Sequence, residues 1–248
     1  MNKKALALSL IAVFISFLGG FLLANALNKN ELNTLRGDNE KLKNSPNIET
    51  QNSSEITLSD EELRRKISEA DQNPVNIVVQ RGLGLALYRY ASIKQDTEIL
   101  SDVARLLMRS YEKNSNDFEV TTALGNVYFD IGYFKKDDEN FQKAREFYTQ
   151  ALKEKPNDAD VRTDFGLTYF LLNTPENEKA ITEFQKSLRI NPRHEKTLQV
   201  IAQAFLAENK PEEAERYILR LREVNGNNSN LPNLVTRLEE SKNNFQKK

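Results

Sequence analysis

The sequence predicts an all-α protein built from repeated pairs of amphipathic helices. The clearest pair occupies Leu124–Pro156, where small and apolar residues recur around Gly125 and again at Ala144, Tyr148 and Ala151. Residues spaced three or four positions apart share one face of a helix. The closing proline cannot continue a helix, so the pair ends there.

The same order of residues occurs four times along the chain. In each copy the first helix carries an apolar residue followed by glycine or alanine, and the second helix begins its apolar series with alanine. The copies are Leu83-Gly84 with Ala104, Leu124-Gly125 with Ala144, Phe165-Gly166 with Ala180, and Ile201-Ala202 with Ala214. Because the copies keep this order, they indicate a repeat protein.

This pattern resembles the tetratricopeptide repeat (TPR). The resemblance implies a right-handed superhelix in which the first helix of each repeat lines a concave groove. About four helix-turn-helix repeats are expected within a TPR domain at 59–241, with a capping box at its start from Ser59 and Glu62. The repeats are 77–117, 118–158, 159–194 and 195–228, followed by a capping helix at 231–241 and a polar tail at 242–248.

The copies are longer than the usual TPR period of about 34 residues. Counted from Leu83 through Leu124 and Phe165 to Ile201, the steps are 41, 41 and 36 residues. The extra residues fall near Lys94–Glu98 and Lys135–Asn140, where the two helices of a repeat join. They form either longer helices or loops on one face of the array.

A membrane anchor is expected at the N-terminus, within residues 1–27. The run Ala5–Leu27 contains no charged residue, and a helix of ~20 apolar residues spans a bilayer. Lys3 and Lys4 precede it, as is usual on the cytoplasmic side. The expected protein therefore has one transmembrane helix, in a bacterial inner membrane, with the TPR domain outside the cytoplasm.

Two alternatives to this topology remain open. Ala24-Asn25-Ala26 matches a signal-peptidase site, although the apolar run is longer than a typical signal-peptide core. The opposite orientation is favoured by the Lys and Arg residues that follow the run, which outnumber the pair before it: Lys29, Arg36, Lys41 and Lys43.

The segment 28–58 combines a short helical pattern with a linker. In Glu31–Lys43, Leu32, Leu35, Asn39 and Leu42 fit the a and d positions of two heptads. Charges at the flanking positions suit a parallel homodimer, although a solvated helical stub is the alternative. Residues 44–57 are polar and rich in Asn and Ser, as in a flexible linker.

Composition excludes several classes of function. The chain has no cysteine and one histidine, so it offers no thiolate metal site, cysteine nucleophile or histidine pair. Its net charge is −1, without the basic stripe of a nucleic-acid-binding protein. No phosphate-binding glycine loop or nucleophile elbow is present. We therefore expect no enzyme activity and no cofactor.

The TPR resemblance places candidate partner-binding residues on the first helix of each repeat. They are Arg81, Leu85, Tyr88, Arg89, Asn126, Phe129, Leu167 and Phe170. Together with Leu171, the apolar members form a strip that suits an amphipathic helix or an extended peptide. About half of the strip is expected to be accessible, because apolar residues on helices are often core residues.

Some TPR domains clamp a C-terminal carboxylate with Lys and Asn. Here Asn126 fits that pattern, but Leu85, Asp160 and Thr163 occupy the other positions, so no clamp is expected. The layout resembles bacterial envelope TPR proteins, either those that present apocytochrome in cytochrome c maturation or those associated with the secretion translocon. We expect a membrane-tethered scaffold for a protein or peptide; the alternatives are a structural dimer and an enzyme or ligand-binding protein that uses the same array.

Overall fold

The computed structural model describes residues 59–246, and all the regular structure in this range is helical. The expected membrane segment Ala5–Leu27, the heptads of Glu31–Lys43 and the linker lie outside the described residues. Within 59–246, no helix is both long and apolar enough to cross a membrane.

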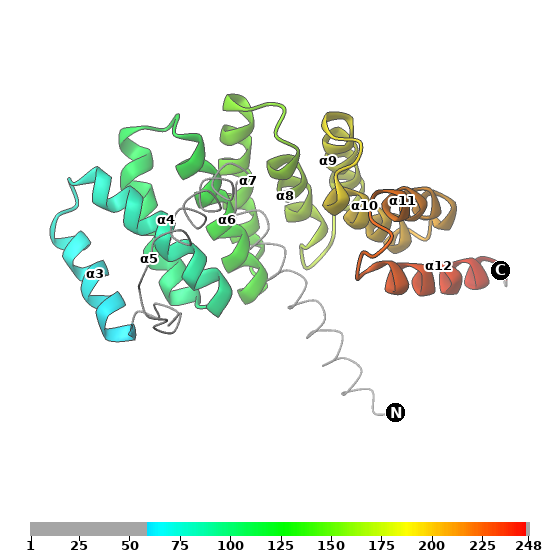
Figure 1. Ribbon diagram of the computed structural model, residues 1–248, viewed down its shortest axis with the longest axis horizontal. Helices are drawn as coiled ribbons and strands as arrows, with labels where there is room; N and C mark the ends of the chain where they lie inside the picture. Colours follow the sequence, from blue (N-terminus) through cyan, green and yellow to red (C-terminus); the bar gives the residue numbers. More distant parts are fainter. Residues whose placement is uncertain (1–58, 247–248) are drawn as a thin grey trace, which may run out of the picture.

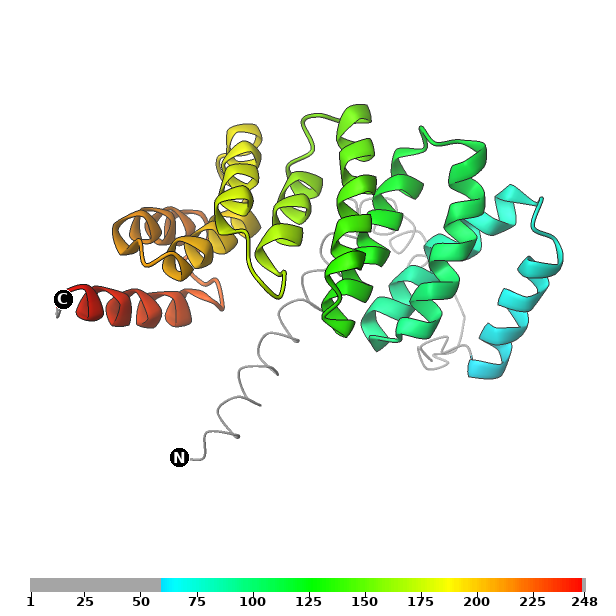
Figure 2. The same cartoon turned by 180° about the vertical axis from the view of Figure 1, so that it is seen from behind.

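The helices follow one another along the long axis of the molecule, with α3 at one end and α12 at the other (Figure 1). The same succession is seen from behind in Figure 2. After α3 (Asp60–Gln72) come four helix pairs and then α12 (Leu231–Gln246). The pairs are α4 (Ile77–Lys94) with α5 (Thr97–Lys113), α6 (Phe118–Lys135) with α7 (Asp138–Glu154), α8 (Ala159–Phe170) with α9 (Asn177–Ile190), and α10 (Glu195–Ala207) with α11 (Pro211–Val224).

The extra residues of the first two repeats lengthen their helices. Helices α4 and α6 have 18 residues each, whereas α8 has 12 and α10 has 13. The turns between the paired helices are short, because Gln95 and Lys136 adopt left-handed backbone conformations and the next residue caps the following helix. These residues therefore form no inserted loop.

Glycines allow the two helices of a pair to approach closely. A Cβ atom on Gly84, Gly125 or Gly166 would lie 2.7, 2.5 or 2.6 Å from the side chain that faces it. Those side chains are Leu107, Tyr148 and Phe184, and all three are buried. The glycine of each repeat therefore accepts a large residue from the second helix.

The contacts between neighbouring repeats show how the array curves. Helix α4 contacts α6, α6 contacts α8, and α8 contacts α10, whereas the second helices of neighbouring repeats lie farther apart. The first helices are therefore on the inner side of the curve. We call the surface formed by α4, α6, α8 and α10 the inner face.

Candidate partner-binding surface

Polar contacts join α4 to α6 across the inner face. Ser92 Oγ and Tyr88 Oη donate hydrogen bonds to the carboxylate of Asp130, at 2.8 and 3.2 Å. Asp130 is 1% exposed, and this burial raises its pKa to about 7, against the lowering effect of the two hydrogen bonds. A carboxyl group that changes charge near neutral pH therefore lies between the first two repeats.

A second polar cluster joins α8 to α10. Lys196 Nζ donates a hydrogen bond to the carboxylate of Asp164, and both side chains are buried. Burial raises the pKa of Asp164, although the charge of Lys196 acts in the opposite direction. His194 is half-buried; its Nε2 lies 3.0 Å from Asp160 Oδ1, and its Nδ1 lies 2.6 Å from Thr197 Oγ1.

Four of the candidate residues belong to α4. Arg81 Nε forms an ion pair with Asp117 Oδ2 at 2.8 Å, and Arg81 Nη2 pairs with Glu119. These two ion pairs limit the availability of Arg81 to a partner. Leu85 and Tyr88 are half-buried, and Arg89 is exposed. This helix therefore offers one exposed cation and two partly accessible apolar groups.

Two of the four candidates on α6 and α8 are buried, and the other two are half-buried. Phe129 is 4% exposed and packs edge-to-face against Phe141, with the ring centroids 5.5 Å apart. Leu167 is 7% exposed. Asn126 is half-buried and accepts a hydrogen bond from Tyr148 Oη, at 2.9 Å. Phe170 is half-buried against Phe184.

The predicted apolar strip is therefore interrupted. Phe129 and Leu167 are core residues, and their burial does not fit a role as surface anchors. Leu85, Tyr88, Phe170 and Leu171 remain partly accessible. The physical reason is that α6 contacts α4, α5, α7 and α8 together, so more than one of its faces is buried.

The inner face also carries polar atoms that the protein does not satisfy. Thr122 Oγ1 and Gln199 Nε2 are buried, and neither has a hydrogen-bond partner among the described residues. Each belongs to the fifth residue of a first helix, α6 for Thr122 and α10 for Gln199. Buried polar atoms are nearly always paired, so these two are exceptions; Gln199 is 1% exposed and lies below the surface, whereas Thr122 is half-buried.

Comparison with known proteins identifies the fold. Residues 125–158 match the family model described as "Tetratricopeptide repeat". A thermophilic TPR protein from Thermus thermophilus superposes with a TM-score of 0.51 at 16% identity, over 73% of this chain and 88% of its own. The chain has the fold of TPR proteins. The crystal structure of MamA shares this TPR fold, with a TM-score of 0.52 at 19% identity over 80% of this chain and 95% of its own. No curated protein matches the sequence.

The TPR fold is a scaffold for protein interactions, and on this chain the scaffold presents a mixed polar and apolar inner face. Sequence periodicity did not identify Asp164 or Ser92 as part of that face. The sequence does show a polar residue inside an otherwise buried first helix. Because a buried polar group needs a hydrogen-bond partner, such a residue predicts a polar contact with a neighbouring helix. Asp130 and Lys196 give the same signal.

Proposed function

We propose that the protein is a membrane-tethered TPR scaffold that binds an extended segment of a partner protein along its inner face. The partly accessible apolar side chains of the inner face support this proposal most directly; Leu85 and Tyr88 lie on α4, and Phe170 lies on α8. These helices belong to repeats one and three, so a ligand that contacts both must run along the array.

An extended segment suits these positions because its backbone offers N–H and C=O groups at regular intervals. The hydroxyl of half-buried Thr122 can donate or accept one such hydrogen bond. Leu85, Tyr88 and Phe170 are partly accessible and supply apolar contacts for alternate side chains of the segment.

The tethering part of the proposal rests on the uncharged run Ala5–Leu27. In this proposal the TPR domain lies outside the cytoplasm at a bacterial inner membrane. The partner is then an envelope protein, such as an apocytochrome awaiting haem or a component of a translocon-associated complex. A structural dimer formed through Glu31–Lys43 is the alternative from another class.

Thr122→Val tests the proposed surface with little risk to the fold. The hydroxyl has no internal partner among the described residues, so its replacement by a methyl group should leave thermal unfolding unchanged. Loss of one hydrogen bond to the partner should weaken capture by about five- to tenfold, from ~1 kcal/mol. The measurement is affinity for a partner first isolated by crosslinking from membranes with the 248-residue chain.

Thr182→Val is the matched control, since Thr182 is exposed on the second helix α9. It should bind the partner like the unmodified chain. If both variants bind with native affinity, the inner face at repeat two is not the binding surface. Equal weakening by both would likewise argue against it.

A further inference from the structure

The N-terminal end of the array is an incomplete repeat. Every later junction between two repeats has the same turn. The residue before the first helix donates its backbone N–H to the carbonyl oxygen three residues earlier. The N···O distance is 3.1–3.3 Å for Asp117, Asp158 and His194. Asn76 makes this bond to Asn73 at 3.2 Å, so α3 joins α4 as a second helix joins the next repeat. Within 59–246, no first helix precedes α3.

The missing helix leaves one face of α4 uncovered. The third, sixth and tenth residues of α6, α8 and α10 are all buried at 9% exposure or less, and contacts to the preceding repeat contribute to this burial. In α10, for example, Thr197 lies 2.6 Å from Thr163 of that repeat. The buried residues are Val120, Ala123, Val127, Val161, Asp164, Thr168, Thr197, Val200 and Ala204.

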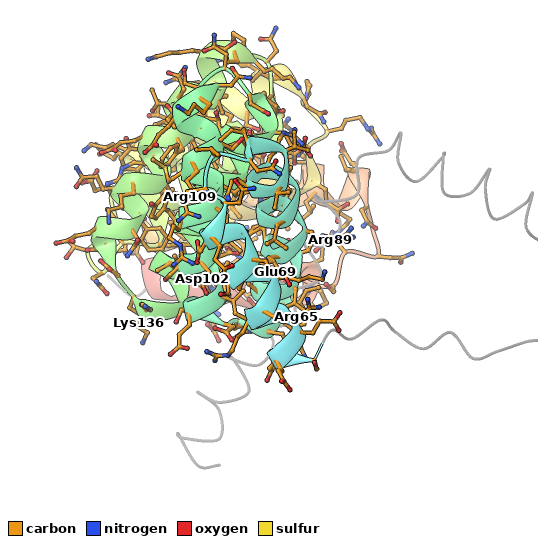
Figure 3. The ribbon with its side chains drawn as sticks, turned by 90° about the vertical axis from the view of Figure 1, so that its left-hand side faces the viewer. Arg65, Glu69, Arg89, Asp102, Arg109 and Lys136 are labelled. Atoms are coloured by element: carbon orange, nitrogen blue, oxygen red, sulfur yellow. The ribbon has the colours of Figure 1, made fainter. Side chains whose placement is uncertain are left out.

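The equivalent residues of α4 are exposed. Val79 is 42% exposed, and Gly82, Ala86 and Arg89 continue the same exposed face. A Cβ atom on Gly82 would meet nothing within 4 Å. Val75 and Val78 beside this face are 78% and 83% exposed. Figure 3 looks onto this end of the array and shows Arg89 to one side of α3, with Asp102 and Arg109 on the other.

We infer that residues Glu31–Lys43 pack as a helix along this face of α4 and complete the half repeat. Leu32, Leu35, Asn39 and Leu42 are spaced three, four and three residues apart, and so are Val79, Gly82, Ala86 and Arg89. The apolar residues of the segment therefore align with the uncovered face. Packing against α4 stabilises a helix too short to form alone.

The chain connection and the charges support this occupant. The first helix of a repeat runs toward the start of its second helix, and the start of α3 lies near the end of α4, where Tyr90 Oη contacts Asp60 at 3.5 Å. The proposed helix would then end, at Lys43, beside the start of α3. Residues 44–58 reach up to ~50 Å when extended, far more than this connection needs. Asp38 and Glu40 flank the position opposite Ala86 and can pair with exposed Arg89.

Engineered cysteines test the contact directly, because the chain has no native cysteine. Asn39→Cys with Ala86→Cys, in the 248-residue chain, should be bridged by a short bismaleimide within one molecule. The yield should not change on tenfold dilution, because the tether supplies an effective concentration on the order of millimolar. The control pair Asn39→Cys with Leu219→Cys uses an exposed residue at the far end of the array and should react at least about tenfold less.

Adding Leu32→Asp and Leu35→Asp to the Asn39→Cys and Ala86→Cys pair should abolish its crosslink. The same two substitutions in the control pair should leave its low crosslinking yield unchanged. Crosslinked dimers that disappear on dilution would show that the segment pairs with a second copy, and the inference would be overturned. Equal yields from the two cysteine pairs would overturn it as well, since the segment would then have no fixed place on α4.

Discussion

At the residue scale, the buried carboxylates of the inner face reduce stability near neutral pH. Asp130 has a pKa of about 7 in the folded protein, against 3.8 for a solvated aspartate. Between these values the folded state binds a proton that the unfolded chain has released. Stability therefore falls as pH rises from about 4 to 7, and the cost is complete above pH 7.

Asp130→Asn should remove this pH dependence. An amide oxygen still accepts the hydrogen bonds of Ser92 and Tyr88, but it carries no charge to bury. Relative to the native chain, the variant should gain ~4 kcal/mol of unfolding free energy between pH 4 and pH 8, because the pKa rises from 3.8 to about 7 on folding and each pKa unit corresponds to ~1.4 kcal/mol. Urea unfolding at both pH values measures the difference, and a constant difference would contradict the assignment.

Asp117→Asn is a control with the opposite sign. Burial acts to raise the pKa of Asp117, but the hydrogen bond and charge of Arg81 outweigh it, and the pKa is lowered. Its contribution is therefore present above the unfolded pKa and is lost on acidification. Asparagine remains a good N-cap for α6, so the variant should lose ~0.5–1 kcal/mol at pH 7 and less at pH 3.

The candidate site was only partly predictable at this scale. Periodicity identifies the buried stripe of a helix that has one buried face, but α6 is buried against four neighbouring helices. The repeat pattern therefore predicts a groove position for Phe129, although this residue lies in the core at 4% exposure. Arg89 is exposed because α4 has fewer neighbours. The sequence around each residue does not distinguish buried Phe129 from exposed Arg89, because their burial depends on contacts between repeats.

At the element scale, small residues set the distance between paired helices. The sequence pattern of glycine in the first helix and alanine in the second predicted a helical array, and all the regular structure in residues 59–246 is helical. It did not decide whether the extra residues of the first two repeats form loops. The helix caps decide this, because Asp96 and Asp137 start the second helices immediately after short turns.

Gly125→Ala should destabilise the array. The added Cβ would lie 2.5 Å from the ring of Tyr148, which is 1% exposed and held by its hydrogen bond to Asn126. Overpacking of this kind costs ~1–3 kcal/mol, measurable as a lower urea midpoint. Gly226→Ala is the control, because Gly226 is exposed, its φ is not positive and an added Cβ would lie 3.5 Å from the carbonyl oxygen of Arg222, an ordinary contact; it should leave the midpoint unchanged or raise it. Equal effects at both glycines would contradict the packing.

At the scale of the whole molecule, the expected order is an anchor, a linker and a curved array. Protease added to intact spheroplasts should remove the TPR domain if residues 28–248 lie outside the cytoplasm. Immunoblotting against the array reads the result, with a cytoplasmic protein as the protection control. A protected array, or a mature N-terminus at Leu27, would refute the uncleaved outward-facing anchor.

Binding of a partner along the inner face is the central claim, and site-specific photo-crosslinking tests it most directly. A benzophenone side chain replaces Phe170 on α8 in one variant and Tyr217 on the second helix α11 in the other; both native rings are half-buried. The inner position should crosslink a discrete partner in cells, and the outer position should not. Crosslinking from Tyr217 but not from Phe170 would contradict the claim.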